Sequence, residues 1–360
     1  MADYKPIPIG IEDFKEIIDR NCYFVDKTML IGDILDDGSK VTLFTRPRRF
    51  GKTLNMSMLR RYFEKTEEDN SYLFDGLKIA GAGEKYHKYM GQYPVISISL
   101  KSMKQASYEL ALNEFKKIIS GEFRRHKEIL KSDMIFESDK EEFLYICNRR
   151  GGYSVYNTAL KFLSDLLSEI YGKNVIVLID EYDVPLENAY FNGFYKEMTD
   201  LIRSVFESVL KTNNSLEFGV LTGCLRISKE SIFTGLNNLN VYSVTDNAFS
   251  QYFGFTEQEV KQLADYYGLS DCFETIKNWY NGYLFGKTEI YNPWSVLKYI
   301  QSSLSGDSNI LKAYWVNTSS NSIIHELITK SDRKTKNDIE TLITGGSIDI
   351  LTSIAKYTNI

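Results

Sequence analysis

The sequence has few of the residues that bind metals or form disulfides. It holds three histidines and four cysteines among 360 residues. No two cysteines have the spacing of a metal-binding or redox pair; they are Cys22, Cys147, Cys224 and Cys272. This argues against a histidine-rich metal centre and a disulfide scaffold, and it predicts reduced thiols in a cytoplasmic protein.

Long apolar runs and a strong charge of one sign are also missing. No run approaches the length needed to cross a membrane, and we expect neither a signal peptide nor a membrane contact. The net charge is −5, which argues against a protein coated in nucleic acid but not against a local basic patch. Hydrophobic residues make up 43% of the chain, so a large core can form, and the length allows two domains.

What is present is organised around residues 41–53. An apolar, β-prone run at 41–45 leads into a basic loop, and Gly51, Lys52 and Thr53 end the loop before a helical pattern begins. A strand, a loop and a helix in this order are the context of a phosphate-binding P-loop. Glycine lacks a Cβ atom, so the backbone there can approach an anion closely, and the N-terminus of the helix favours negative charge.

In such a loop Lys52 would contact the β- and γ-phosphates and Thr53 would ligate Mg²⁺. One position departs from the usual pattern, because Arg46 stands where a P-loop begins with glycine. A basic turn before an ordinary amphipathic helix is therefore the alternative. The residues predicted to bind nucleotide are Arg46, Pro47, Arg48, Arg49, Phe50, Gly51, Lys52, Thr53 and Leu54.

The second feature is a strand that ends in two acids. Residues 175–179 are all apolar, which predicts burial on both faces, as in a parallel sheet. Asp180 and Glu181 follow at the carboxyl end, where open α/β sheets bind their ligands. Beside a Gly-Lys-Thr loop, we expect Asp180 to hold Mg²⁺ and Glu181 to polarise the water that attacks the γ-phosphate. A strand that simply ends in acids at a polar turn is the alternative, and Asp183 either supports the site or turns the chain.

The next predicted strand, 216–222, ends in a polar residue. Thr222 is placed to sense the γ-phosphate or to hold the attacking water, so we include it with Glu181 among the catalytic candidates. Arg226 would neutralise phosphate charge, in its own subunit or from a neighbouring one, or it is an ordinary surface arginine. Cys224, between them, is interpreted as a buried small hydrophobe and not as a nucleophile.

The N-terminal approach segment is predicted to hold two short helices, 13–18 and 29–35, the second of which stops at Gly38 before the first strand. Between these helices stand Asp26 and Lys27. Two interpretations remain open for this pair: contact with a nucleotide base or ribose, or a helix boundary with a surface ion pair.

The overall pattern predicts an α/β fold, namely a P-loop NTPase with a three-layer α/β/α arrangement and a C-terminal helical lid. We assign residues 1–250 to the P-loop domain, including a charged, peripheral helical insertion at about 102–150, and residues 251–360 to the helical domain. In the latter, 279–286 is interpreted as an aromatic turn. The predicted strands of the parallel sheet are 41–45, 93–100, 174–181, 216–222 and 241–244.

Together these motifs resemble the bacterial AAA-ATPase-like family, whose members often carry a PD-(D/E)XK-type nuclease domain after the ATPase. The family loop also reads Arg-Pro-Arg-Arg-Phe-Gly-Lys-Thr, so Arg46 is a family trait. The resemblance implies ATP binding at 46–53, with Mg²⁺ and water roles for 180–181. It extends over roughly residues 6–300 and is carried by Phe24–Thr28, Arg46–Thr53, Asp180–Pro185, Leu221–Gly235 and Tyr291–Ser295.

Three functions are compatible with these motifs. The first is an ATPase that hydrolyses ATP with Mg²⁺ to drive a conformational switch of the helical lid. The second is a nucleotide-gated module that recruits a partner without turnover. The third is the ATPase half of a nuclease-containing DNA-processing or defence protein, with DNA or a partner protein bound through a C-terminal domain and an oligomer as a possible assembly; residues 300–360 contain no acid–x–lysine strand of the nuclease type.

Overall fold

The chain divides into two compact units, Met1–Lys312 and Ala313–Ile360. In the second unit the main described element is the helix α16, Arg333–Ile343. The sheet and the predicted site residues belong to the first unit. The computed structural model describes residues 4–225, 232–233, 236–306, 311–312, 314, 328–329, 331–343, 346 and 348.

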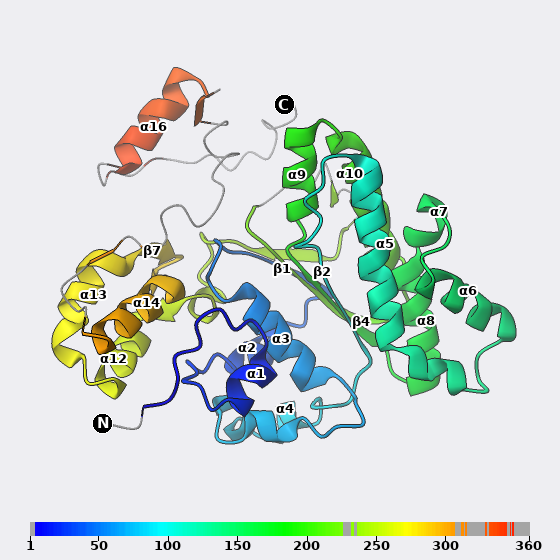
Figure 1. The fold of residues 1–360 in the computed structure, drawn as a ribbon, viewed down its shortest axis with the longest axis horizontal. Coiled ribbons are helices and arrows are strands. Elements are labelled where there is room, and N and C mark those ends of the chain that lie inside the picture. The colour runs from blue at the N-terminus through cyan, green and yellow to red at the C-terminus, as the bar shows by residue number, and fades with distance from the viewer. Residues whose placement is uncertain are drawn as a thin grey trace. The chain divides into compact units, whose positions relative to one another are not determined.

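A five-stranded parallel sheet forms the centre of the first unit (Figure 1). Its order is β2-β3-β4-β1-β5, with every neighbouring pair parallel. This confirms the predicted P-loop type of α/β fold, and each predicted strand is present, the last one beginning and ending two residues earlier. Because the strands are parallel, the carboxyl ends of β1, β3 and β4 lie along the same edge of the sheet. The strands are β1 (Val41–Thr45), β2 (Val95–Ser99), β3 (Val175–Asp180), β4 (Leu216–Gly223) and β5 (Leu239–Tyr242).

Helices cover both faces of this sheet. The side chains of β3 alternate: Val177 and Ile179 join one hydrophobic cluster, whereas Ile176 and Leu178 join the other. The apolar run therefore serves two cores at once, as its lack of polar residues indicated. The first face is covered mainly by α5 (Tyr108–Arg125), α6 (Glu137–Cys147), α7 (Tyr153–Tyr156), α8 (Ala159–Tyr171), α9 (Val184–Asn192) and α10 (Tyr195–Phe206), and the second by α1 (Phe14–Asp19), α2 (Met29–Asp37), α3 (Lys52–Phe63) and α4 (Glu84–His87).

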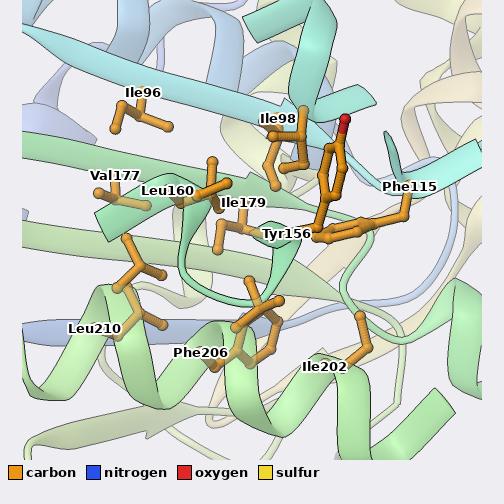
Figure 2. Close-up of a cluster of buried hydrophobic side chains, with 14 of the residues drawn as sticks. Ile96, Ile98, Phe115, Tyr156, Leu160, Val177, Ile179, Ile202, Phe206 and Leu210 are labelled. Atoms are coloured by element: carbon orange, nitrogen blue, oxygen red, sulfur yellow. The ribbon is translucent and has the colours of Figure 1, made fainter. Parts of the chain in front are cut away.

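Figure 2 shows the first of these clusters, in which strand side chains meet residues from several helices. The segment at 102–150 is helical, as predicted, but it is not peripheral. Phe115 and Phe123 of α5 are fully buried in the same cluster as Ile96 and Ile98 of β2. Most of its charged side chains lie on the outer face of helices whose inner face covers the sheet, although Glu122 is buried and accepts a hydrogen bond from the N–H of Ser97 in β2. The charge runs therefore did not reveal the role of the segment in the core.

Residues 249–304, which we call the small lobe, combine helices with a second sheet. Its three strands are antiparallel in the order β6-β8-β7. Helices were predicted here, but the sheet was not, and the predicted aromatic turn at 279–286 is the end of α13 followed by β7. Alternating exposure along β7, with Leu284 exposed and Phe285 buried, is the period of a half-buried strand. The elements are β6 (Phe255–Thr256), α12 (Glu257–Tyr266), α13 (Phe273–Tyr280), β7 (Asn281–Phe285), β8 (Thr288–Tyr291) and α14 (Pro293–Leu304).

Candidate nucleotide site

The loop between β1 and α3 lies at the carboxyl edge of the sheet. Gly51 caps α3 with a φ of +82°, in the left-handed region that glycine enters without steric cost. Arg49 also has a positive φ, +69°. The first N–H groups of a helix have no partner inside the helix. Those at the start of α3 are therefore available to an anion, while Leu54 in the first turn packs against the core.

Lys52 is 4% exposed and its ammonium joins three parts of the edge. Nζ donates to the carbonyl oxygens of Arg46 and Pro47 at 3.0 and 3.1 Å and contacts Sγ of Cys224 at 3.3 Å. It also lies 3.9 Å from Oε1 of Glu181. The loop, the end of β3 and the residue after β4 thus converge on one cation.

Thr53 and Asp180 are in direct contact, although they are far apart in the sequence. Thr53 Oγ1 donates to Asp180 Oδ2 at 2.8 Å, and Thr222 Oγ1 donates to the other oxygen of the same carboxylate. A hydroxyl beside a carboxylate suits Mg²⁺, which takes one or two protein oxygens together with phosphate and water. Within the described residues, no three histidine, cysteine or acidic side chains form a metal site by themselves, so a cation here would also need oxygens from a ligand.

Glu181 follows Asp180 with a φ of +57°, an unusual conformation for a residue with a long side chain. Burial raises the pKa of its carboxyl group above the usual range; the charge of Lys52 opposes this, and the neighbouring Asp180 and Asp183 add to it. A carboxylate whose proton affinity has been raised is a better base near neutral pH. The raised pKa and the position 3.9 Å from Lys52 Nζ make Glu181 the candidate to accept a proton.

Arg46 occupies the position where a P-loop usually begins with glycine, and its side chain is completely buried. Its Nη1 donates to the carbonyl oxygens of Tyr242 and Thr45 at 2.8 and 3.0 Å. The guanidinium lies 5.2 and 5.3 Å from the ring centroids of Phe253 and Phe285. Burial lowers its pKa to about 10. The side chain therefore joins the loop to β5 and to the small lobe, and only the backbone of Arg46 faces Lys52.

The next side chains of the loop also contact neighbouring elements. Arg48 forms an ion pair of 2.8 Å with Glu187 of α9. The guanidinium of Arg49 lies 4.1 Å from the ring centroid of Trp294 at the start of α14. Phe50 is fully buried against aromatic rings of β7. Arg49 and Phe50 are thus turned to the small lobe, whereas Arg48 also hydrogen-bonds Cys224 beside Lys52 and so borders the site.

A family model described as a predicted AAA-ATPase matches residues 8–233. The chain belongs to this AAA-ATPase-like family. An uncharacterized protein from Azotobacter chroococcum mcd 1, described as lying in the vnfD 5′ region, is 28% identical over 334 residues, which are 91% of this chain and 56% of that protein. The chain thus spans little more than half the length of this relative.

Among solved structures, the Walker-type ATPase PABY2304 of Pyrococcus abyssi aligns with 96% of this chain and 79% of its own, at 15% identity and a TM-score of 0.40. Across the described parts of the chain, none of the helices has the length and apolar character needed to span a bilayer.

In this AAA-ATPase-like chain the N-terminal pair Asp26 and Lys27 makes internal contacts. Asp26 accepts hydrogen bonds from the backbone N–H groups of Thr28 and Lys78 at 2.9 and 2.7 Å. Lys27 Nζ donates to Glu259 Oε1 of α12 at 2.7 Å. The helix boundary and the ion pair are therefore both present, but the ion pair is buried and links the N-terminal segment to the small lobe.

Arg226 and Cys224 are two further residues considered in the sequence of this AAA-ATPase-like chain. Arg226 lies outside the described residues, so its role stays a prediction. Cys224 is more than a buried hydrophobe, because its sulfur contacts Lys52. Burial raises the pKa of this thiol to about 11, against the charge of Lys52, so the group is a neutral contact and a poor nucleophile. Its position just after a strand at the carboxyl edge was the available signal.

Proposed function

We propose that this chain binds ATP with Mg²⁺ and hydrolyses it, and that hydrolysis drives a conformational switch. The observation that carries the proposal is the 2.8 Å hydrogen bond between Thr53 Oγ1 and Asp180 Oδ2. This bond joins the start of α3, the helix that follows the proposed phosphate-binding loop, to the end of the acidic strand, at the edge where parallel sheets bind ligands. Membership of an ATPase family supports the same reading.

Each group at this edge has a separate role in binding ATP. Amides at the start of α3 cradle the phosphates. Lys52 exchanges neutral carbonyl partners for phosphate oxygens, and charge-assisted hydrogen bonds are roughly twice as strong as neutral ones. Thr53 and Asp180 would hold Mg²⁺ with their adjacent oxygens. When bound, this ion neutralises the negative charge of the β- and γ-phosphates.

The residues at the strand ends carry the reaction. Glu181 orients a water and accepts its proton as the water oxygen bonds to the γ-phosphorus, while the bond from this phosphorus to the β-phosphate oxygen breaks and ADP leaves. The hydroxyl of Thr222, now bound to Asp180, would hold that water or contact the γ-phosphate, so loss of the phosphate changes what this hydroxyl can bond.

The switch would use the outward contacts of the loop. Arg46 and Phe50 connect the loop to Phe253, Tyr283 and Phe285 of the small lobe. A backbone contact adds to this, since the N–H of Gly254 donates to the carbonyl of Phe50 at 3.1 Å. A change in the loop when phosphate leaves would therefore displace the lobe.

The test is a titration with ATP and a slowly hydrolysed analogue, with and without Mg²⁺, read together with phosphate release. We expect saturable binding that is tighter with Mg²⁺, and phosphate release above background. Lys52→Ala should weaken binding by roughly 10-fold or more, because it removes a buried charged donor worth about 1.5–3 kcal/mol. Lys88→Ala, a change at a surface lysine of α4's C-terminus, is the control.

Two results would overturn parts of the proposal. If Lys52→Ala binds ATP as well as the parent, the loop is not the nucleotide site. If ATP binds but phosphate release stays at background, the chain is a nucleotide-gated recruitment module and not an ATPase.

A further inference from the structure

One carboxylate beyond the acid pair holds the backbone that follows β4. The N–H groups of Cys224 and Leu225 both donate to Asp183 Oδ2, at 2.8 and 2.7 Å. Asp183 is 1% exposed. Burial raises the pKa of its carboxyl group, and the two backbone hydrogen bonds oppose this. A carboxylate that only turned the chain would face water, so these contacts call for another role.

The residue before it reinforces the same contact. The hydroxyl of Tyr182 donates to the carbonyl of Leu225 at 2.5 Å, and its own N–H donates to the carbonyl of Thr222 at 3.0 Å. The two side chains also fill the space above Gly223. A Cβ atom there would lie 2.4 Å from Cε1 of Tyr182 and 2.8 Å from Oδ1 of Asp183, which excludes any larger residue without rearrangement.

The backbone held by Asp183 lies between two groups of the proposed site, Thr222 before it and Lys52 beside it. Thr222 donates to Asp180, and the sulfur of Cys224 lies 3.3 Å from Nζ of Lys52. Asp183 itself is turned to the backbone and is closed off from solvent, so it acts through these neighbours.

We propose that Asp183 is a positioning residue: its hydrogen bonds to residues 224–225 set the places of Thr222 and of the Lys52 ammonium for ATP hydrolysis. The proposal rests on the ATPase function proposed above. The proposal predicts that positioning depends on the acceptor oxygen of residue 183 and not on its charge. Asparagine has the same shape and keeps one acceptor oxygen, which can still receive both N–H groups.

The experiment compares the parent with Asp183→Ala and Asp183→Asn in three measurements: kcat and KM for phosphate release, ATP binding by titration, and the rate at which iodoacetamide alkylates Cys224, followed by peptide mass spectrometry. For Asp183→Ala we expect kcat to fall on the order of 10- to 100-fold, as small displacements in an active site do, with KM changed much less. Cys224 should alkylate faster. Asp183→Asn should restore both values towards the parent.

Tyr182→Phe is a second variant that keeps the ring and loses one hydrogen bond, and it should shift the same measurements less. Asp200→Ala, on the exposed face of α10, is the control for loss of an aspartate. Thermal melting of each variant shows that it is folded.

The outcomes separate this proposal from the ATPase function. If the parent releases no phosphate, the ATPase proposal fails, and Cys224 alkylation alone decides the role of Asp183. Unchanged alkylation in Asp183→Ala overturns the positioning role, as does parental kcat in that variant. Equal changes of kcat and of Cys224 alkylation in Asp183→Asn and Asp183→Ala also overturn it, since the hydrogen-bond acceptor would then not be what positions the site.

Discussion

Glu181 has two features that are costly for a folded protein. Its backbone lies in the left-handed region, and its carboxyl group is buried enough that its pKa is raised. Strained conformations of this kind persist where the surrounding structure enforces them and are common at active sites. At the scale of single residues, the fold therefore accepts a cost in stability to hold this carboxylate beside Lys52.

Replacing Glu181 by glutamine should separate binding from turnover. Glutamine keeps the size of the side chain but cannot accept a proton from water, so we expect phosphate release to fall by roughly 10²- to 10⁴-fold, the usual contribution of a general base. ATP binding should remain. A phosphate-release assay beside an ATP titration measures both, and release at the parental rate would remove Glu181 from the mechanism.

The same substitution makes a prediction about stability and pH. The pKa of Glu181 is raised above its ordinary value of 4.5 in the folded state. At pH 7 the folded chain therefore carries a penalty for ionising this group, and at a pH below 4.5 both states are protonated and the penalty is gone. We expect Glu181→Gln to melt at a higher temperature than the parent at pH 7, and this gain to shrink as the pH falls through the raised pKa. A gain that grows towards low pH would contradict the raised pKa.

At the scale of elements, the loop after β1 is held by its side chains and not only by glycine. Arg46, Arg49 and Phe50 each reach an aromatic partner in the small lobe. The loop and the lobe are therefore packed as one assembly, although they are about 200 residues apart in the chain.

Arg46 tests this packing. Arg46→Gly restores the usual P-loop residue but leaves a cavity between two rings, and large-to-small changes in a core cost about 2–5 kcal/mol. Arg46→Met keeps most of the volume and should cost less. Because the guanidinium faces away from Lys52, ATP affinity should change little in Arg46→Met. Urea unfolding and ATP titration measure the two effects; lost affinity at parental stability would show instead that the side chain contacts the nucleotide.

At the scale of the whole first unit, a buried ion pair joins the N-terminal segment to α12. Lys27 is 8% exposed at its side chain and Glu259 is 17% exposed. Glu259 also accepts the N–H of Thr256 in the capping box of α12, at 2.8 Å. Burial lowers the pKa of Lys27, and the charge of Glu259 opposes this. Glu259 thus both caps the start of α12 and forms the ion pair that links α12 to the N-terminal segment.

Breaking this pair from one side should be costly. Lys27→Met leaves a buried carboxylate without its cation, and such single changes cost about 3–5 kcal/mol. The double variant Lys27→Met/Glu259→Gln removes the uncompensated charge and should recover part of the loss. Urea unfolding of the single and double variants measures this. A single-variant cost below about 1 kcal/mol would mean that the pair behaves as a surface salt bridge.

Local patterns in the sequence were sufficient for the central sheet and for the pairing of the two main motifs. An unbroken apolar run indicates a strand buried on both faces, and a Gly-Lys-Thr loop and an acid pair at strand ends must share one edge once the strands are parallel. Charge runs misled the interpretation of 102–150, since α5 hides an apolar face behind them. The strand β7 was missed because an aromatic segment with glycines on both sides fits a turn as well as a hairpin.

The sequence by itself determined which chemical groups gather at the carboxyl edge: Lys52, Thr53, Asp180 and Glu181 each belong to a motif whose meaning is local. Only the tertiary structure decided that Arg46 is buried between rings, that Lys27 pairs with Glu259, and that Asp183 holds residues 224–225. These contacts join residues 41 to 239 positions apart. Nothing in a local pattern encodes such a pairing, because it depends on where separate elements pack against one another.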